Sequence, residues 1–161
     1  MKKNGFTLTE VIVTLLLSGI LLLVLTCQFI ALSRFSAALK DRVEAAREAR
    51  IVTRHMARVL RFAKVNPNPA FASDRLTVTV EGGHFIGEFP IDTVCYYELD
   101  NSLTPASFDF NNGTSKISLS QAVTSFTASY NSVTEEIMLQ LQFTKNNATV
   151  PIQTTIKVLG Q

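Results

Sequence analysis

Residues 6–33 read FTLTEVIVTLLLSGILLLVLTCQFIALS, a stretch of mostly Leu, Ile and Val with a single charged side chain, Glu10. It holds no proline, and Gly19 is its one glycine. About 20 apolar residues, rising about 1.5 Å each in a helix, cross the roughly 30 Å hydrocarbon core of a bilayer. The stretch therefore predicts a membrane-spanning helix, which we assign to residues 6–32. No small-residue cleavage pattern of the A-x-A kind follows it.

Length and composition limit what else the chain holds. Its 161 residues leave room for one ordinary domain beside the apolar helix. Cys27 lies inside the apolar stretch, so we expect no disulfide between it and Cys95. His55 and His84 are the two histidines, and neither is spaced with a nucleophile, a carboxylate pair or a cysteine. We therefore expect no metal, no cofactor and no enzymatic activity.

Charge divides the chain into three parts. Lys2, Lys3 and Glu10 are the charged residues of the first 33 positions. Residues 34–64 carry nine Lys or Arg against three Asp or Glu, and residues 65–161 carry four against nine. The chain thus predicts an apolar head, a basic segment and an acidic body.

The basic segment, residues 33–65, has a helical period. At 100° per residue one side is apolar, formed by Phe35, Ala46, Ala49, Val52, Met56, Val59, Leu60 and Ala63. The opposite side carries an arginine stripe, Arg47, Arg50, Arg54, Arg58 and Arg61. No proline interrupts residues 6–65, so one continuous helix of about 55 to 60 residues, roughly 85 Å long, is predicted. We expect the prolines of NPNP, residues 66–69, to end it.

Beyond NPNP the hydrophobic period changes from 3.6 to 2, which indicates strands. We predict them at 76–80, 93–99, 125–130, 137–143 and 149–159, with KNNA between the last two as a hairpin turn. Four or five antiparallel strands need a cover for their apolar face, and the apolar side of the amphipathic helix can supply it. The sequence therefore predicts an α+β fold, with residues 66–161 as a β-rich body formed by a small sheet wrapped on the helix.

Glu10 requires an explanation, because an unpaired carboxylate in lipid costs several kcal/mol. One interpretation places Glu10 near the membrane interface, where it is protonated or reaches water. The other begins with removal of MKKNG, residues 1–5. Phe6 would then carry a free ammonium about one helical turn from Glu10, and the carboxylate would be its counter-ion among packed helices.

At KKNGFTLTEVIV, residues 2–13, the chain resembles the type IV pilins and the pseudopilins of type II secretion systems. The resemblance implies a leader peptide, residues 1–5, which the prepilin peptidase removes after Gly5 before it methylates the new N-terminal Phe6. It also implies that Glu10 neutralises the amine of a neighbouring subunit while the helices bundle into a filament.

Further features bear on the kind of subunit. Gly19 matches a small residue common in that helix, whereas Thr9 departs from the aliphatic residue usual there. The mid-helix proline of many major pilins is missing near Cys27. Residues 54–65 and 94–103, RHMARVLRFAKV and VCYYELDNSL, resemble W-type minor pilins and J-type pseudopilins. The resemblance implies a minor subunit that takes part in assembly or priming of a pilus or pseudopilus.

The resemblance also implies partners and a location. The partners are other pilin or pseudopilin subunits, the prepilin peptidase, an inner-membrane assembly platform and membrane lipid. The chain would cross the inner membrane once with its N-terminus inside, then enter a filament in the periplasm or outside the cell. Lys2 and Lys3 agree with this orientation, whereas the basic residues beyond the span favour the opposite one, namely Arg34, Lys40, Arg42 and Arg47.

Two local patterns allow a different function. LVLTC, residues 23–27, approximates a lipoprotein signal that would leave Cys27 acylated and the body a membrane-anchored binding module, although Thr26 is larger than usual before such a cysteine. The simpler interpretation is a cysteine packed between helices. FDFNNGTS, residues 108–115, is spaced like part of a calcium loop, but it lacks the later carboxylate, which favours an Asn-Gly turn.

The arginine stripe also has two interpretations. Clustered arginine is the electrostatic footprint of nucleic-acid binding. No aromatic stacking platform accompanies these arginines, so we expect them to contact neighbouring subunits and do not expect nucleic acid to be a partner.

Overall fold

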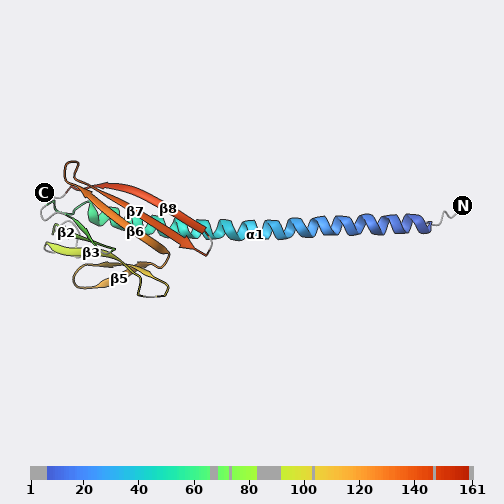
Figure 1. Ribbon diagram of the computed structural model, residues 1–161, viewed down its shortest axis with the longest axis horizontal. Helices are drawn as coiled ribbons and strands as arrows, with labels where there is room; N and C mark the ends of the chain where they lie inside the picture. The colour runs from blue at the N-terminus through green and yellow to red at the C-terminus, as the bar shows by residue number, and fades with distance from the viewer. Residues whose placement is uncertain are drawn as a thin grey trace. The chain divides into compact units, whose positions relative to one another are not determined.

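The computed structural model describes residues 7–65, 69–72, 74–82, 92–102, 104–146 and 148–159. Its elements are α1 (Leu8–Leu60), β1 (Ala70–Ala72), β2 (Arg75–Val80), β3 (Thr93–Asp100), β4 (Ser107–Asn111), β5 (Lys116–Ser120), β6 (Val123–Asn131), β7 (Glu136–Lys145) and β8 (Ala148–Lys157) (Figure 1). One long helix followed by antiparallel sheets confirms the predicted α+β class and is consistent with a pilin-like fold. The chain divides into two compact units, Met1–Lys40 and Asp41–Gln161.

In the first unit every described residue, from 7 to 40, is exposed. This part of α1 is long and apolar enough to cross a membrane. Two of its threonines bond to the helix itself: the Thr14 hydroxyl donates to the Glu10 carbonyl at 2.7 Å, and the Thr26 hydroxyl donates to the Leu22 carbonyl at 2.7 Å. Such bonds satisfy a hydroxyl that would otherwise face lipid.

In the second unit one side of α1 is covered by the sheets. Its buried residues are Ala45, Ala49, Val52, Met56, Val59 and Leu60, spaced three and four apart except at the last step. The predicted apolar side is therefore right from Ala49 onward. It is wrong at Ala46, which lies beside the buried stripe and is exposed, and at Phe35, which is 65% exposed and belongs to the first unit.

The helix ends at Leu60, earlier than predicted. The backbone N–H groups of Phe62 and Ala63 donate to the carbonyls of Val59 and Leu60, closing a tighter turn. Ala63 then forms a bridge with Val80, and the Lys64 N–H donates to the Thr79 carbonyl at 2.7 Å. Pairing with the end of β2 thus takes the chain out of the helix before NPNP, whose residues 66–68 lie outside the described residues.

The described residues of the body form two antiparallel sheets, not the single one expected. One has the order β1-β2-β3-β4-β5 and the other β6-β7-β8. The five predicted strands correspond to β2, β3, β6, β7 and β8, whereas β1, β4 and β5 were missed. β1 is three residues long, and β4 is buried along four consecutive residues, so neither shows a clear period of two.

Aromatic rings of β3, β4 and β6 pack together in the core and so join the two sheets. Tyr97 of β3 stacks on Phe108 of β4, with ring centroids 6.0 Å apart. Phe108 meets Phe126 of β6 edge to face at 4.9 Å. These rings and Met56 of α1 are buried in one hydrophobic core.

Two predicted turns are present in the structure. The segment 112–115 joins β4 to β5 with Gly113 at φ 83°, and the Asn112 side-chain oxygen accepts hydrogen bonds from the N–H groups of Thr114 and Ser115. Asp109, the carboxylate of the calcium alternative, is buried and pairs with Lys116 at 2.8 Å. The other turn joins β7 to β8 between Lys145 and Ala148.

Candidate processing and assembly site

The N-terminus of α1 places Glu10 in the first helical turn. Thr7 precedes the helix, and its carbonyl accepts a hydrogen bond from the Glu10 N–H at 3.0 Å. Its hydroxyl accepts a longer one from the same N–H at 3.4 Å. Thr-x-x-Glu is the capping-box pattern, in which residues at the cap and at the third helical position satisfy each other's N–H groups. The signal is visible in TLTE, and our sequence reasoning missed Thr7 as part of the site.

Glu10 is exposed, and no cation forms an ion pair with it among the described residues. A negative side chain in the first turn of a helix is favoured by the helix dipole, by about 0.3 to 1 kcal/mol. The structure thus gives Glu10 a local role beside the predicted one. Gly5 and Phe6, where cleavage and methylation are predicted, lie outside the described residues.

A shallow groove of about 440 Å³ runs along the apolar part of α1. Gly19 is one of its lining residues, and an added Cβ there would meet nothing within 4 Å. Its other lining residues are Ile12, Leu15, Leu16, Ile20 and Leu23. A glycine on an apolar helix allows a second helix to approach closely, which is how helices associate in lipid.

The arginine stripe lies on the side of α1 away from the core, and all five arginines are exposed. A second shallow groove, of about 360 Å³, follows this side. We call it the arginine groove, and its residues are Arg47, Arg50, Ile51, Arg54, His55 and Arg58. Among the described residues Arg47, Arg50 and Arg54 form no ion pair, whereas Lys64, Arg75, Lys116 and Lys145 of the body all do.

His55 joins the helix to the sheet. Its Nδ1 lies 3.0 Å from the Tyr97 hydroxyl, and its ring meets the edge of Phe110 at 4.9 Å. Tyr97 is fully buried, and this desolvation raises the pKa of its phenol well above the usual value. The hydrogen bond therefore satisfies a buried hydroxyl, which is a packing role. His84 lies outside the described residues.

A polar cluster fastens both sheets to the start of the covered helix. The Ser120 hydroxyl, at the end of β5, donates to the Glu48 carboxylate at 2.5 Å. Lys145, at the end of β7, lies 3.7 Å from the other oxygen of that carboxylate. The Asn146 side chain donates to Asp41 at 2.9 Å. Glu48 therefore links the two sheets through one helical position.

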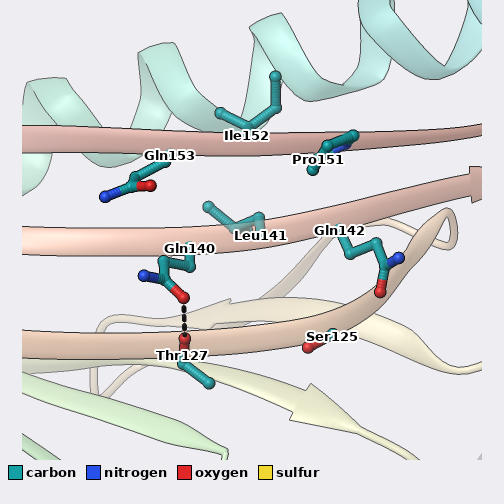
Figure 2. A pocket seen from close by; sticks show the side chains of 8 residues that line it. All are labelled: Ser125, Thr127, Gln140, Leu141, Gln142, Pro151, Ile152 and Gln153. Atoms are coloured by element: carbon teal, nitrogen blue, oxygen red, sulfur yellow. Dashed lines mark hydrogen bonds between the residues drawn. The ribbon is translucent and has the colours of Figure 1, made fainter.

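The outer face of β6, β7 and β8 forms a groove of about 490 Å³, which is lined by uncharged side chains, both polar and apolar. Figure 2 shows the glutamines of β7 and β8 and the hydroxyls of β6 along this face, with α1 behind the sheet. Thr127 donates to Gln140 at 3.5 Å across two strands. None of the residues that line this groove is acidic or basic.

Comparison with known families gives one match. Residues 1–26 match the family described as the prokaryotic N-terminal methylation motif. No curated protein and no solved structure matches the chain. The motif supports a precursor of the type IV pilin and pseudopilin family, anchored in a membrane, processed by prepilin peptidase and assembled with other pilins. It favours a structural subunit over an enzyme.

Proposed function

We propose that the chain is a minor pilin or pseudopilin, a structural subunit for assembly or priming of a type IV pilus or a type II secretion pseudopilus. The observation that carries the proposal is the methylation motif leading directly into an exposed apolar helix with Glu10 in its first turn. Cleavage falls after Gly5, and the new N-terminal Phe6 is methylated. The absence of a proline from residues 6–65 supports the minor-subunit role.

Assembly proceeds by insertion of the α1 apolar part into a bundle of like helices. The Phe6 ammonium needs a counter-ion there, because an unpaired charge among apolar side chains is strongly destabilising. Glu10 of a neighbouring subunit supplies it. Its exposure and its lack of an ion-pair partner among the described residues leave the carboxylate available for such a contact.

Before assembly the subunit is stored in the inner membrane, with the N-terminus inside and the β-rich body outside. Lys2 and Lys3 agree with this orientation, and the basic residues after the span oppose it. A phosphatase fused to the C-terminus, active only outside the cytoplasm, tests it. Activity supports the proposal, and an inactive but folded fusion contradicts it.

N-terminal sequencing and the intact mass of the chain purified from membranes test the function itself. A chain that begins at N-methylated Phe6 supports the proposal. A diacylglyceryl group on Cys27 would instead establish the anchored binding module, and a chain that keeps Met1 would establish a membrane protein that is not processed.

A further inference from the structure

The chain also has an acidic turn, whose charge is opposite to that of the arginine groove. The turn between β6 and β7, residues 131–136, exposes Val133 to 89%. Glu135 and Glu136 follow it, and neither forms an ion pair among the described residues. We call residues 131–136 the valine tip. It presents one apolar side chain beside two carboxylates.

Hydrogen bonds hold the valine tip in a defined shape. The Asn131 side-chain oxygen accepts from the N–H groups of Val133 at 2.9 Å and Thr134 at 3.4 Å. The Glu135 carbonyl accepts from the Val158 N–H at 2.9 Å. A preorganised tip loses little conformational entropy when it binds.

The arginine groove has the complementary arrangement. Ile51 is 54% exposed and lies among arginines on the outer side of α1. Large apolar side chains exposed singly are ordinary, but here Ile51 lies among arginines, and Val133 lies beside two glutamates, one of which, Glu136, has Lys157 as its strand partner. An apolar contact at the centre with ion pairs at its rim is the usual organisation of a protein interface.

We propose that the valine tip of one copy docks in the arginine groove of a second copy. Val133 contacts Ile51, while Glu135 and Glu136 pair with Arg50 and Arg54. The contact joins two different patches, so the first copy keeps its groove and the second keeps its tip for further neighbours. Such a heterologous contact builds a ring or a filament and does not end at a dimer. The inference rests on the proposed function, because it requires two copies of the chain to enter the same assembly.

Site-specific disulfide formation between full-length copies tests the contact. Two differently tagged copies are expressed together in membranes, one with Ile51→Cys and one with Val133→Cys, both with Cys27→Ser. The remaining Cys95 is buried. A disulfide needs Cα atoms about 4.4 to 6.8 Å apart, so it reports close contact. With one new cysteine per copy, bonding within a copy cannot produce the mixed dimer.

A matched control places the second cysteine at Gln153, which is exposed on the outer face of β8. We expect the mixed dimer from Ile51→Cys and Val133→Cys to exceed the control by at least about five-fold, and to fall in about 1 M salt, where the Debye length is about 3 Å. Equal yields from the two pairs would overturn the proposal. If nuclease added before the disulfide forms prevents the dimer, the proposal is also overturned, because nucleic acid would then bridge the copies.

Charge reversal gives a second, independent measurement. Arg50→Glu with Arg54→Glu in the groove copy should lower the yield several-fold, and Glu135→Arg with Glu136→Arg in the tip copy should restore it to within about two-fold. Failure of the restoration contradicts the pairing. N-terminal sequencing of the same samples separates the two proposals: processed chains without the dimer overturn this inference alone, whereas unprocessed chains overturn the proposed function.

Discussion

Substitution of Glu10 distinguishes its local role from its role between subunits. In the structure Glu10 occupies the third helical position after Thr7, where a side chain can serve in a capping box as well as carry a charge. Glu10→Gln keeps a side chain that serves in a capping box and removes the negative charge. Glu10→Leu removes both properties, and Thr7→Ala removes only the cap.

The two roles differ in magnitude. The cap is an exposed hydrogen bond of 3.4 Å from the Glu10 N–H to the Thr7 hydroxyl, which contributes about 0.5 kcal/mol. The helix dipole adds about 0.5 kcal/mol for the charge. An ammonium left unpaired among apolar helices costs about 3 kcal/mol, which is roughly a 100-fold change in an equilibrium. We therefore expect Glu10→Gln and Glu10→Leu to enter filaments roughly 100-fold less than wild type, and Thr7→Ala to stay within about three-fold.

The assay compares the subunit in filaments sheared from cells with the subunit left in membranes. Each fraction is normalised to the chains that begin at Phe6, so that a defect in processing is not counted as a defect in assembly. If Glu10→Gln assembles like wild type while Glu10→Leu does not, the side chain acts through the cap, and the pairing of Glu10 with an amine is refuted.

Three further predictions concern the body. Met56→Ala, at a fully buried helix position, should lower the free energy of unfolding by about 3 kcal/mol in urea titrations of the full chain in detergent, whereas Met138→Ala, at a position 39% exposed, should change it by less than about 0.5 kcal/mol. Burial raises the pKa of the Cys95 thiol to about 11, so a maleimide at about pH 8 should label it only after unfolding; rapid labelling of the native chain would contradict its burial. Hydrogen bonds from Ser102 lower the pKa of Asp100 below its usual 3.8, so the carboxylate stabilises the fold above that pH and the stabilisation disappears as pH falls below it. Ser102→Ala should make the acid loss of melting temperature shallower between about pH 5 and about pH 2, and an unchanged profile would argue against the bond.

The sequence predicts well those parts of the fold that depend on one period. The apolar stretch from Leu8 and the helical stripe from Ala49 to Met56 each follow a single repeat, and the structure confirms both as parts of α1. The strands that alternate cleanly, such as β7, were also recognised. The helical stripe and the alternating strands each have one side in the core and one side out, which is the condition for a readable period, whereas the apolar stretch is recognised by its length and composition.

The parts of the fold that were missed, β4 and the early end of α1, show no such pattern in the sequence. Ser107, Phe108, Asp109 and Phe110 of β4 are all buried, and the carboxylate of Asp109 is paired with Lys116. A strand that is buried on both faces and contains a charged residue is difficult to recognise from the sequence. The early end of α1 at Leu60 was equally hidden, because it depends on pairing of Ala63 with Val80, a contact between distant positions.

In the candidate site, too, some residues can be recognised from the sequence and others only from the fold. Glu10 and the arginines stand out in the sequence, because a charge in an apolar stretch and a stripe on one helix side are both local patterns. The valine tip does not stand out. Its chemistry depends on Val133 being held at the end of a hairpin and on Ile51 lying away from the core, and only the fold reveals both.

A consequence for assembly follows from the two units. Every described side chain of the first unit is exposed, so that helix must lie in lipid or among other helices. Because lipid tails are as apolar as leucine, transfer from a bilayer into a helix bundle gains little hydrophobic free energy. The preference for the filament must then come from terms that lipid cannot supply. The available ones are a counter-ion for the Phe6 amine at Glu10, close helix approach at Gly19, and contacts of the body such as the valine tip in the arginine groove.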